Sequence, residues 1–180
     1  MSKITDFFKC EEPTENNNCL ICFTDGSCRN NGKPNAVASY AIVWPFHPEL
    51  DYATRLEGKV QTNNRAEYQA VISALEQSVL LDPGYSKTLI IYTDSMLLIN
   101  SVTQWMHNWK KNNWKKSDGK TVLNLDLLKK LDILTNTRKV SLRFVKAHTG
   151  NSNWESIYNH KVDQMAQNAS GSGSSSLNHA

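Results

Sequence analysis

The sequence predicts an α/β protein, of the mixed α+β kind, with a central sheet flanked by helices. The first part of the chain has the pattern of three strands joined by short links, which is typical of antiparallel neighbours. The apolar spacing then changes to a helical period, and helices and strands alternate along the rest of the fold. Parallel strands need long crossovers, usually helices, so the two patterns together predict a mixed sheet.

Three strands come first. The apolar run at residues 20–24 ends at Asp25-Gly26, a dipeptide typical of turns. Residues 37–44 are rich in β-forming side chains and are followed by two prolines. Residues 52–57 alternate between two faces, which predicts a half-buried third strand.

Helices and strands alternate after this point. The first helix ends before Asp82-Pro83-Gly84, a strong stop signal. The apolar spacing predicts helices at 64–81, 95–106, 127–134 and 162–169, and strands at 89–93 and 140–145.

A length of 180 residues with 39% hydrophobic side chains suits one domain. We expect a flexible arm at 1–18, a globular domain at 19–169 and a flexible Gly/Ser tail at 170–180. No apolar run approaches the ~18 residues of a membrane span, and the first 18 residues resemble neither a signal peptide nor a transit peptide. The four cysteines are too few and too clustered for a disulfide framework. We therefore expect an intracellular monomer without a membrane partner, in the nucleus or cytoplasm rather than the mitochondrion.

The formal net charge of +3 is unevenly distributed. Residues 105–120 contain five lysines and one acid, Asp118, so this segment carries +4 and the rest of the chain −1. Trp105, Trp109 and Trp114 lie in the same segment. Lysines interleaved with aromatic side chains predict that a polyanion docks there.

Four acidic residues lie at the ends of strands or in helices: Asp25, Glu67, Asp94 and Asp163. Each has an ordinary structural explanation. Asp25 could belong to a turn, and Asp94 could cap the helix that follows it. Glu67, in the first turn of its helix, could form a capping box with Asn64. Asp163 could be a solvated helix residue.

Their joint position favours a functional interpretation. The carboxyl ends of parallel strands open into one crevice, where ligands bind. Carboxylates gathered there repel one another unless a cation neutralises them, and oxygen ligands suit Mg²⁺ or Mn²⁺ rather than zinc. Two such ions about 4 Å apart can activate water and stabilise the leaving oxygen of a phosphodiester.

The acids lie within recognisable motifs. These are Thr24-Asp25-Gly26-Ser27, Thr62-Asn63-Asn64-Arg65-Ala66-Glu67, Tyr92-Thr93-Asp94-Ser95, and Val145-Lys146-Ala147-His148-Thr149-Gly150 followed by Asn159-x-x-x-Asp163. In this order they resemble ribonuclease H of type 1, over residues 20–169. The segment from Trp105 to Lys115 is similar to the basic protrusion of the eukaryotic branch.

The resemblance implies a five-stranded mixed sheet with three antiparallel strands first. It also implies endonucleolytic hydrolysis of the RNA strand of RNA–DNA hybrids, leaving 5′-phosphate and 3′-hydroxyl ends. Two Mg²⁺ ions, or Mn²⁺, would be held by the carboxylates of Asp25, Glu67, Asp94 and Asp163. His148 matches the family's flexible catalytic histidine.

The resemblance further implies how the hybrid is held. Asn31, Asn63 and Asn64 match residues that bind the hybrid in its minor groove, although each could also be a turn or cap residue. Residues matching or adjoining the DNA-strand contacts are Thr62, Trp105, Trp109, Lys110, Lys111 and Asn124. For the two tryptophans, at i and i+4, the alternative is a buried helical stripe, and for Asn124 it is a helix cap.

The chain departs from the family pattern in three places. One is Val60, where many relatives have a basic residue near the phosphate pocket. Residues 148–159 are expected to form a loop longer than is usual in the family, with Trp154 in a mobile position. The N-terminal hybrid-binding domain of many eukaryotic relatives is not expected here.

Cys19-x-x-Cys22, with Cys10 and Cys28, could suggest zinc, but the family match places Cys22 in the core.

Two rival functions stay open from sequence. A non-catalytic hybrid-binding module would keep the groove residues, but it has no need of four converging carboxylates. Other nucleases and integrases share the architecture, and fold alone does not choose among them. The exonucleases need Asp-x-Glu on the first strand, whereas Gly26 and Ser27 follow Asp25 here.

Overall fold

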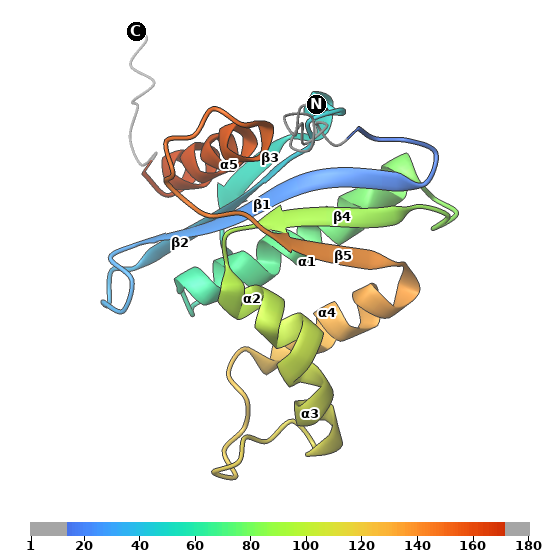
Figure 1. The fold of residues 1–180 in the computed structure, drawn as a ribbon. Helices are drawn as coiled ribbons and strands as arrows, with labels where there is room; N and C mark the ends of the chain where they lie inside the picture. Colours follow the sequence, from blue (N-terminus) through green and yellow to red (C-terminus); the bar gives the residue numbers. More distant parts are fainter. Residues whose placement is uncertain (1–13, 172–180) are drawn as a thin grey trace, which may run out of the picture.

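The computed structural model describes residues 14–171. Five strands form one mixed sheet in the order β3-β2-β1-β4-β5. Helices α1 and α4 pack on one face of the sheet and α5 packs on the other (Figure 1). The predicted fold class and sheet are confirmed.

The strands alternate in direction only in the first half of the sheet. Antiparallel pairing joins β1 to β2 and β2 to β3, whereas β4 is parallel to both β1 and β5. The strand bounds are β1 Cys19–Arg29, β2 Val37–Val43, β3 Tyr52–Arg55, β4 Thr88–Thr93 and β5 Val140–Phe144.

The prediction of a turn at Asp25-Gly26 is wrong, because β1 continues through both residues to Arg29. Asp25 pairs with Ala41 and Gly26 with Tyr40, so the link to β2 lies beyond Arg29. The glycine has a different purpose. A Cβ on Gly26 would lie 2.5 Å from the backbone nitrogen of Glu67, so its absence lets α1 approach β1.

The predicted helices are present, with two differences. The last helix begins at Trp154 rather than at residue 162. The helix expected at 95–106 is built from α2, a π-helical turn at Ser101–Trp105, and α3, and it continues five residues further. The helix bounds are α1 Asn63–Leu81, α2 Met96–Asn100, α3 Met106–Lys111, α4 Leu125–Thr137 and α5 Trp154–Gly171, with a short 3₁₀ turn at Pro48–Leu50.

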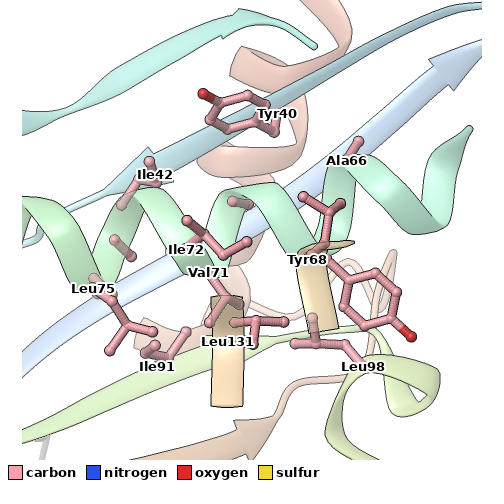
Figure 2. Close-up of a cluster of buried hydrophobic side chains, with 14 of the residues drawn as sticks. Tyr40, Ile42, Ala66, Tyr68, Val71, Ile72, Leu75, Ile91, Leu98 and Leu131 are labelled. Carbon is pink, nitrogen blue, oxygen red and sulfur yellow. The ribbon is translucent and has the colours of Figure 1, made fainter. Parts of the chain in front are cut away.

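The core has two layers because β1 is buried on both faces. Leu20 and Cys22 point toward α1 and α4, and Ile21 and Phe23 point toward α5. Figure 2 shows the larger layer, in which Val71, Ile72 and Leu75 of α1 meet side chains of the sheet and of α4. The sheet and α1 are therefore held rigidly where their ends carry polar residues.

A buried ion pair links the elements at the other end of α1. Arg138, which follows α4, donates to Ser78 and to the carboxylate of Asp82. Asp82 also accepts hydrogen bonds from Ser86 and from the backbone of Lys87. The pair therefore joins α1, the start of β4 and the start of β5.

The ends of the described chain are attached to the fold. The Glu15 carboxylate accepts from the backbone of Ile21 at 3.0 Å and lies 2.6 Å from His47, so the last part of the predicted arm is attached to the sheet. Helix α5 runs to Gly171, two residues beyond the predicted domain boundary. Residues 1–13 and 172–180 of the arm and tail lie outside the described residues. Between residues 14 and 171 we find no helix with the length and apolar character of a membrane span.

Candidate active site

Three of the four predicted carboxylates meet where the parallel pairing of β1 and β4 ends. Asp25 lies in β1, and Asp94 directly follows β4. The register of the two parallel strands pairs Phe23 with Tyr92, which brings Asp25 and Asp94 side by side two residues later. Oxygen atoms of Asp25, Glu67 and Asp94 all lie within 4.8 Å of one another. We call these three residues the acidic trio.

Glu67 reaches the trio from α1. The sequence predicts Glu67 in the first turn of the helix, but it lies in the second turn. The cap is Thr62, whose hydroxyl accepts from the backbone of Arg65 at 3.2 Å, so no capping box with Asn64 holds Glu67. The side chain is 3% exposed. Its position is therefore not explained by helix capping.

The capping explanation also fails for Asp94. Ser95 caps α2, because its hydroxyl accepts from the backbone of Leu98 at 3.1 Å. The Asp94 carboxylate instead accepts from the side-chain amide of Asn159 at 3.3 Å. The Asp94 carboxylate thus lies between the other two acids of the trio and Asn159 of α5.

The crowding of the trio shifts its pKa values upward. Burial, and then the charges of Glu67, Asp94 and Asp163, raise the pKa of Asp25 to about 11. Burial and the charge of Asp94 raise the pKa of Glu67 to about 8. Burial also raises the pKa of Asp94, against the opposing effects of Asn159 and His148. Such shifts mark a cluster that is unfavourable as free anions and suited to a cation.

Asp163, the fourth predicted carboxylate, lies beside the trio but outside it. It projects from α5, and its charge and a side-chain hydrogen bond both raise the pKa of Asp25. Its two oxygens also accept from the amide of Gln167, at 2.9 and 3.0 Å. The residue therefore borders the site from the opposite face of the sheet.

The donor set of the trio fits a hard divalent cation. Glu67 Oε2 is buried and has no hydrogen-bond partner, so it is free to serve as a ligand. Within residues 14–171 the trio is the single group of acids, histidines or cysteines with metal-site spacing. Cys22 is fully buried in the core, as expected, and Cys10 lies outside the described residues.

His148 lies on an exposed loop between β5 and α5. Its charge lowers the pKa of Asp94, and its backbone has a φ of +52°. Together with Lys146, Asn159, His160 and Asp163 it lines a cavity of about 320 Å³. The sequence motif uses Asn159 only to identify Asp163, four residues later, and predicts no role for Asn159 itself. Its contact with Asp94 depends on how α5 packs, which no local pattern reveals.

The expectation that Trp154 occupies a mobile position is wrong. The residue begins α5, and its ring packs 5.2 Å from Phe23 and 5.8 Å from Tyr92. The predicted long loop is thus shorter than expected, since residues 154–159 are helical. An apolar ring finds buried partners here because both strands present aromatic side chains toward α5.

The predicted groove residues cluster at the start of α1. Thr62 and Asn63 are partly exposed, and Asn64 is exposed. The side chain of Asn31, from the loop after β1, accepts from the backbone of Asn63 at 3.2 Å. The structure thus joins the loop after β1 to the start of α1, the helix that also carries Glu67.

The two tryptophans do not form a buried stripe. Their ring centroids are 6.0 Å apart; Trp105 is 38% exposed, and Trp109 packs partly against the core. They line a cavity of about 170 Å³ with Asn64 and Asn124, among others. Asn124 stands at the start of α4 without a capping side-chain bond and accepts from Arg65 at 3.3 Å.

The lysines of this segment differ in their surroundings. Lys110 and Lys111 are both exposed, and Lys110 pairs with Asp132 of α4 at 2.9 Å. The segment projects from the sheet below α2 (Figure 1). An exposed basic protrusion is therefore present, but one of its two predicted contact lysines already has an acidic partner.

Comparison with known proteins identifies the family. The RNase H family model matches residues 17–171. Ribonuclease H of Clostridium botulinum is 37% identical over 151 residues, covering 83% of this chain and 94% of that protein. Ribonuclease H1 of Mus musculus is 38% identical over 149 residues, covering 82% of this chain, and this chain spans about half, 49%, of that relative's length.

Solved structures share the fold. The PFV RNase H domain has a TM-score of 0.67 at 22% identity, covering 84% of this chain and 94% of that domain. LC11-RNase H1, solved in complex with an RNA/DNA hybrid, has a TM-score of 0.57 at 20% identity, covering 84% of this chain and 96% of that one. Given the fold, the acidic trio and these matches, the chain belongs to the RNase H family.

Proposed function

We propose that this chain is an endoribonuclease that hydrolyses the RNA strand of RNA–DNA hybrids and leaves 5′-phosphate and 3′-hydroxyl ends. The observation that carries the proposal is the meeting of three carboxylates, two of them buried, within 4.8 Å of one another. Relatives named Ribonuclease H and a structural neighbour bound to a hybrid support the same substrate.

The acidic trio, with Asp163 beside it, would hold two Mg²⁺ ions, for which Mn²⁺ could substitute. When bound, these ions supply Lewis-acid chemistry for attack of water on a phosphodiester. The protein's own part is to hold the oxygens together in a buried place. Gly26 allows Glu67 to approach, and Asn159 orients Asp94.

His148 is proposed to move protons at the reacting centre. It is exposed on its loop and lies close enough to Asp94 to influence that carboxyl. An imidazole changes its charge near neutral pH, so it can accept a proton and release it again. Because it lies on a loop, His148 could also assist release of the product.

Recognition of the hybrid is proposed to divide between two surfaces. Asn31, Asn63 and Asn64 would contact 2′-hydroxyl groups across the shallow minor groove, since amides both donate and accept hydrogen bonds. The DNA strand would lie against Thr62, Trp105, Trp109, Lys110, Lys111 and Asn124. We propose a monomer acting in the nucleus or cytoplasm.

Replacing Asp94 with Asn tests the enzyme against a non-catalytic binding module. The D94N variant should lose cleavage of a labelled hybrid while retaining hybrid binding, because the groove residues are unchanged. E76Q, which alters an exposed carboxylate of α1 paired with Lys130, should cleave normally. Cleavage by D94N at the wild-type rate would contradict the proposal.

A further inference from the structure

An aromatic cluster lies under the loop that carries His148. The ring of Trp154 contacts Phe23 at 5.2 Å, Tyr92 at 5.8 Å and Tyr158 at 5.2 Å, measured between ring centroids. Phe23 and Tyr92 stack on each other at 4.8 Å. Trp154 therefore packs onto a rigid platform built by β1 and β4.

This platform belongs to the same two strands as the acidic trio. Phe23 precedes Asp25 by two residues, and Tyr92 precedes Asp94 by two. Side chains at i and i+2 of a strand point to the same face. Trp154 is thus seated on the face of β1 that carries Asp25, which is the face covered by α5.

The loop between β5 and α5 is fixed at its two ends. At its start, the backbone of Val145 donates to the carbonyl of Thr93, the residue before Asp94, at 2.9 Å. At its end, Trp154 is held by the aromatic platform. His148 lies between these two points.

The first turn of α5 is also bonded to the loop. The hydroxyls of Thr149 and Ser156 lie 3.2 Å apart, and Asn153 caps the helix by accepting from the backbone of Ser156 at 2.9 Å. His148 has a left-handed backbone, with φ of +52°. A non-glycine residue persists in that conformation only where its surroundings hold it.

We propose that Trp154 is a positioning residue, whose ring anchors the start of α5 and thereby keeps the loop with His148 beside Asp94. The effect of Trp154 on catalysis rests on the proposed function, whereas its effect on the order of the loop does not. The entropic cost of ordering a loop rises with its length, so an anchor five residues before Asn159 shortens the segment that must be ordered.

The kinetic test is a double-mutant cycle on a labelled hybrid. W154A should lower kcat at least about tenfold, with KM nearly unchanged, because a displaced catalytic group slows chemistry without weakening binding. In the H148A background the same substitution should have no further effect on kcat. W154F, which keeps a ring, should restore most of the activity.

A matched control separates positioning from general destabilisation. Met165, also on α5, packs against the same core layer but carries no aromatic ring. M165A should lose thermal stability without the fall in kcat. An equal loss of kcat from W154A with and without His148, or an unchanged kcat in a folded W154A protein, would overturn the proposal.

Amide hydrogen exchange tests the structural step without any substrate. Exchange at residues 146–152 should accelerate in W154A while β1 and β4 stay protected. Unchanged exchange in this loop would overturn the proposal, whether or not the protein cleaves hybrids. A wild-type protein that does not cleave hybrids would count only against the proposed function. If W154A does not fold, W154L, which keeps apolar volume without a ring, replaces it in both measurements.

Discussion

Glu67 is an acid in a place that disfavours its charge. It is 3% exposed, and one of its carboxylate oxygens has no hydrogen-bond partner. Asp94 adds a like charge, so the pKa of Glu67 rises from 4.5 to about 8. In the absence of a cation, the folded protein therefore loses stability as the pH rises from 4.5 to about 8, because the unfolded chain releases this proton while the folded protein keeps it.

Substituting Glu67 with Gln should stabilise the metal-free protein in a pH-dependent way. Below about pH 4 the carboxyl is neutral in both states, so the variant gains little. As the pH rises from 4.5 to 8, only the unfolded wild type ionises freely, and the free energy of unfolding of the wild type falls. The Tm advantage of E67Q in EDTA should grow across this range, by about 2–4 °C for each kcal/mol.

The same melts with Mg²⁺ provide the internal control. The cation should raise the Tm of the wild type more than that of E67Q, because ligands that bind only the folded state stabilise it. A Tm difference that stays constant from pH 4.5 to 8 would show that Glu67 is not strained as a free anion.

The identity of the acids is predictable from sequence, but their neighbours are not. Asp25 and Asp94 follow apolar strand patterns, so their convergence follows from the general rule for parallel strands. Asn159 contacts Asp94 across 65 positions of sequence, and this depends on the angle at which α5 crosses the sheet. Trp154 is plainly apolar, yet its partners lie on strands far away in sequence.

The approach of α1 to β1 depends on one missing side chain. A Cβ on Gly26 would lie 2.5 Å from the nitrogen of Glu67 and 2.8 Å from the carbonyl carbon of Ala66. These are backbone atoms, so the helix itself would have to move. The dipeptide pattern of Asp25-Gly26 predicts a turn from local preference alone, whereas packing against α1 is what requires this glycine.

G26A is therefore expected to reduce both stability and cleavage. Overpacking of this kind costs about 1–3 kcal/mol, and the shift of α1 would move Glu67 away from the trio. Differential scanning calorimetry and a hybrid-cleavage assay measure the two effects. G84A is the matched control, since a Cβ there has no neighbour within 4 Å, and normal activity of G26A would refute this explanation.

The buried pair of Arg138 and Asp82 stabilises the opposite end of the sheet. Burial alone would raise the pKa of Asp82, but hydrogen bonds from Lys87 and Ser86 and the charge of Arg138 together lower it. R138M should cost about 3–5 kcal/mol in urea unfolding, because it leaves a buried carboxylate without its charged partner. Combining it with D82N should cost less than the sum of the two single changes, whereas strict additivity would argue against a coupled pair.

The molecule places its polar chemistry at one end of the sheet. The acidic trio lies where the pairing of β1 and β4 ends, and the groove asparagines lie at the start of α1 and in the loop after β1. The basic protrusion projects below the sheet from α2 and α3 (Figure 1). The uneven charge is visible in the sequence. The distance between the lysines and the carboxylates cannot be predicted from the sequence, because the course of the chain from α2 to α3 determines where the lysines project.

Charge on the protrusion should control the salt dependence of hybrid binding. K111A/K115A should weaken binding and reduce the slope of log K against log salt by about 0.9 for each phosphate that is no longer neutralised. K87A/K139A removes the same charge from the amino ends of β4 and β5 and should leave the slope unchanged. Equal slopes for both double variants, measured by fluorescence anisotropy, would exclude the protrusion as a binding surface.

Selective, metal-dependent cleavage by the acidic trio is the property on which the proposed function depends. It is tested most directly by incubating the protein with end-labelled RNA–DNA hybrid, RNA duplex and DNA duplex, each with and without Mg²⁺. We predict cuts in the RNA strand of the hybrid alone, and only with the metal. Cleavage of the hybrid in EDTA, or equal cleavage of the three duplexes, would contradict this prediction.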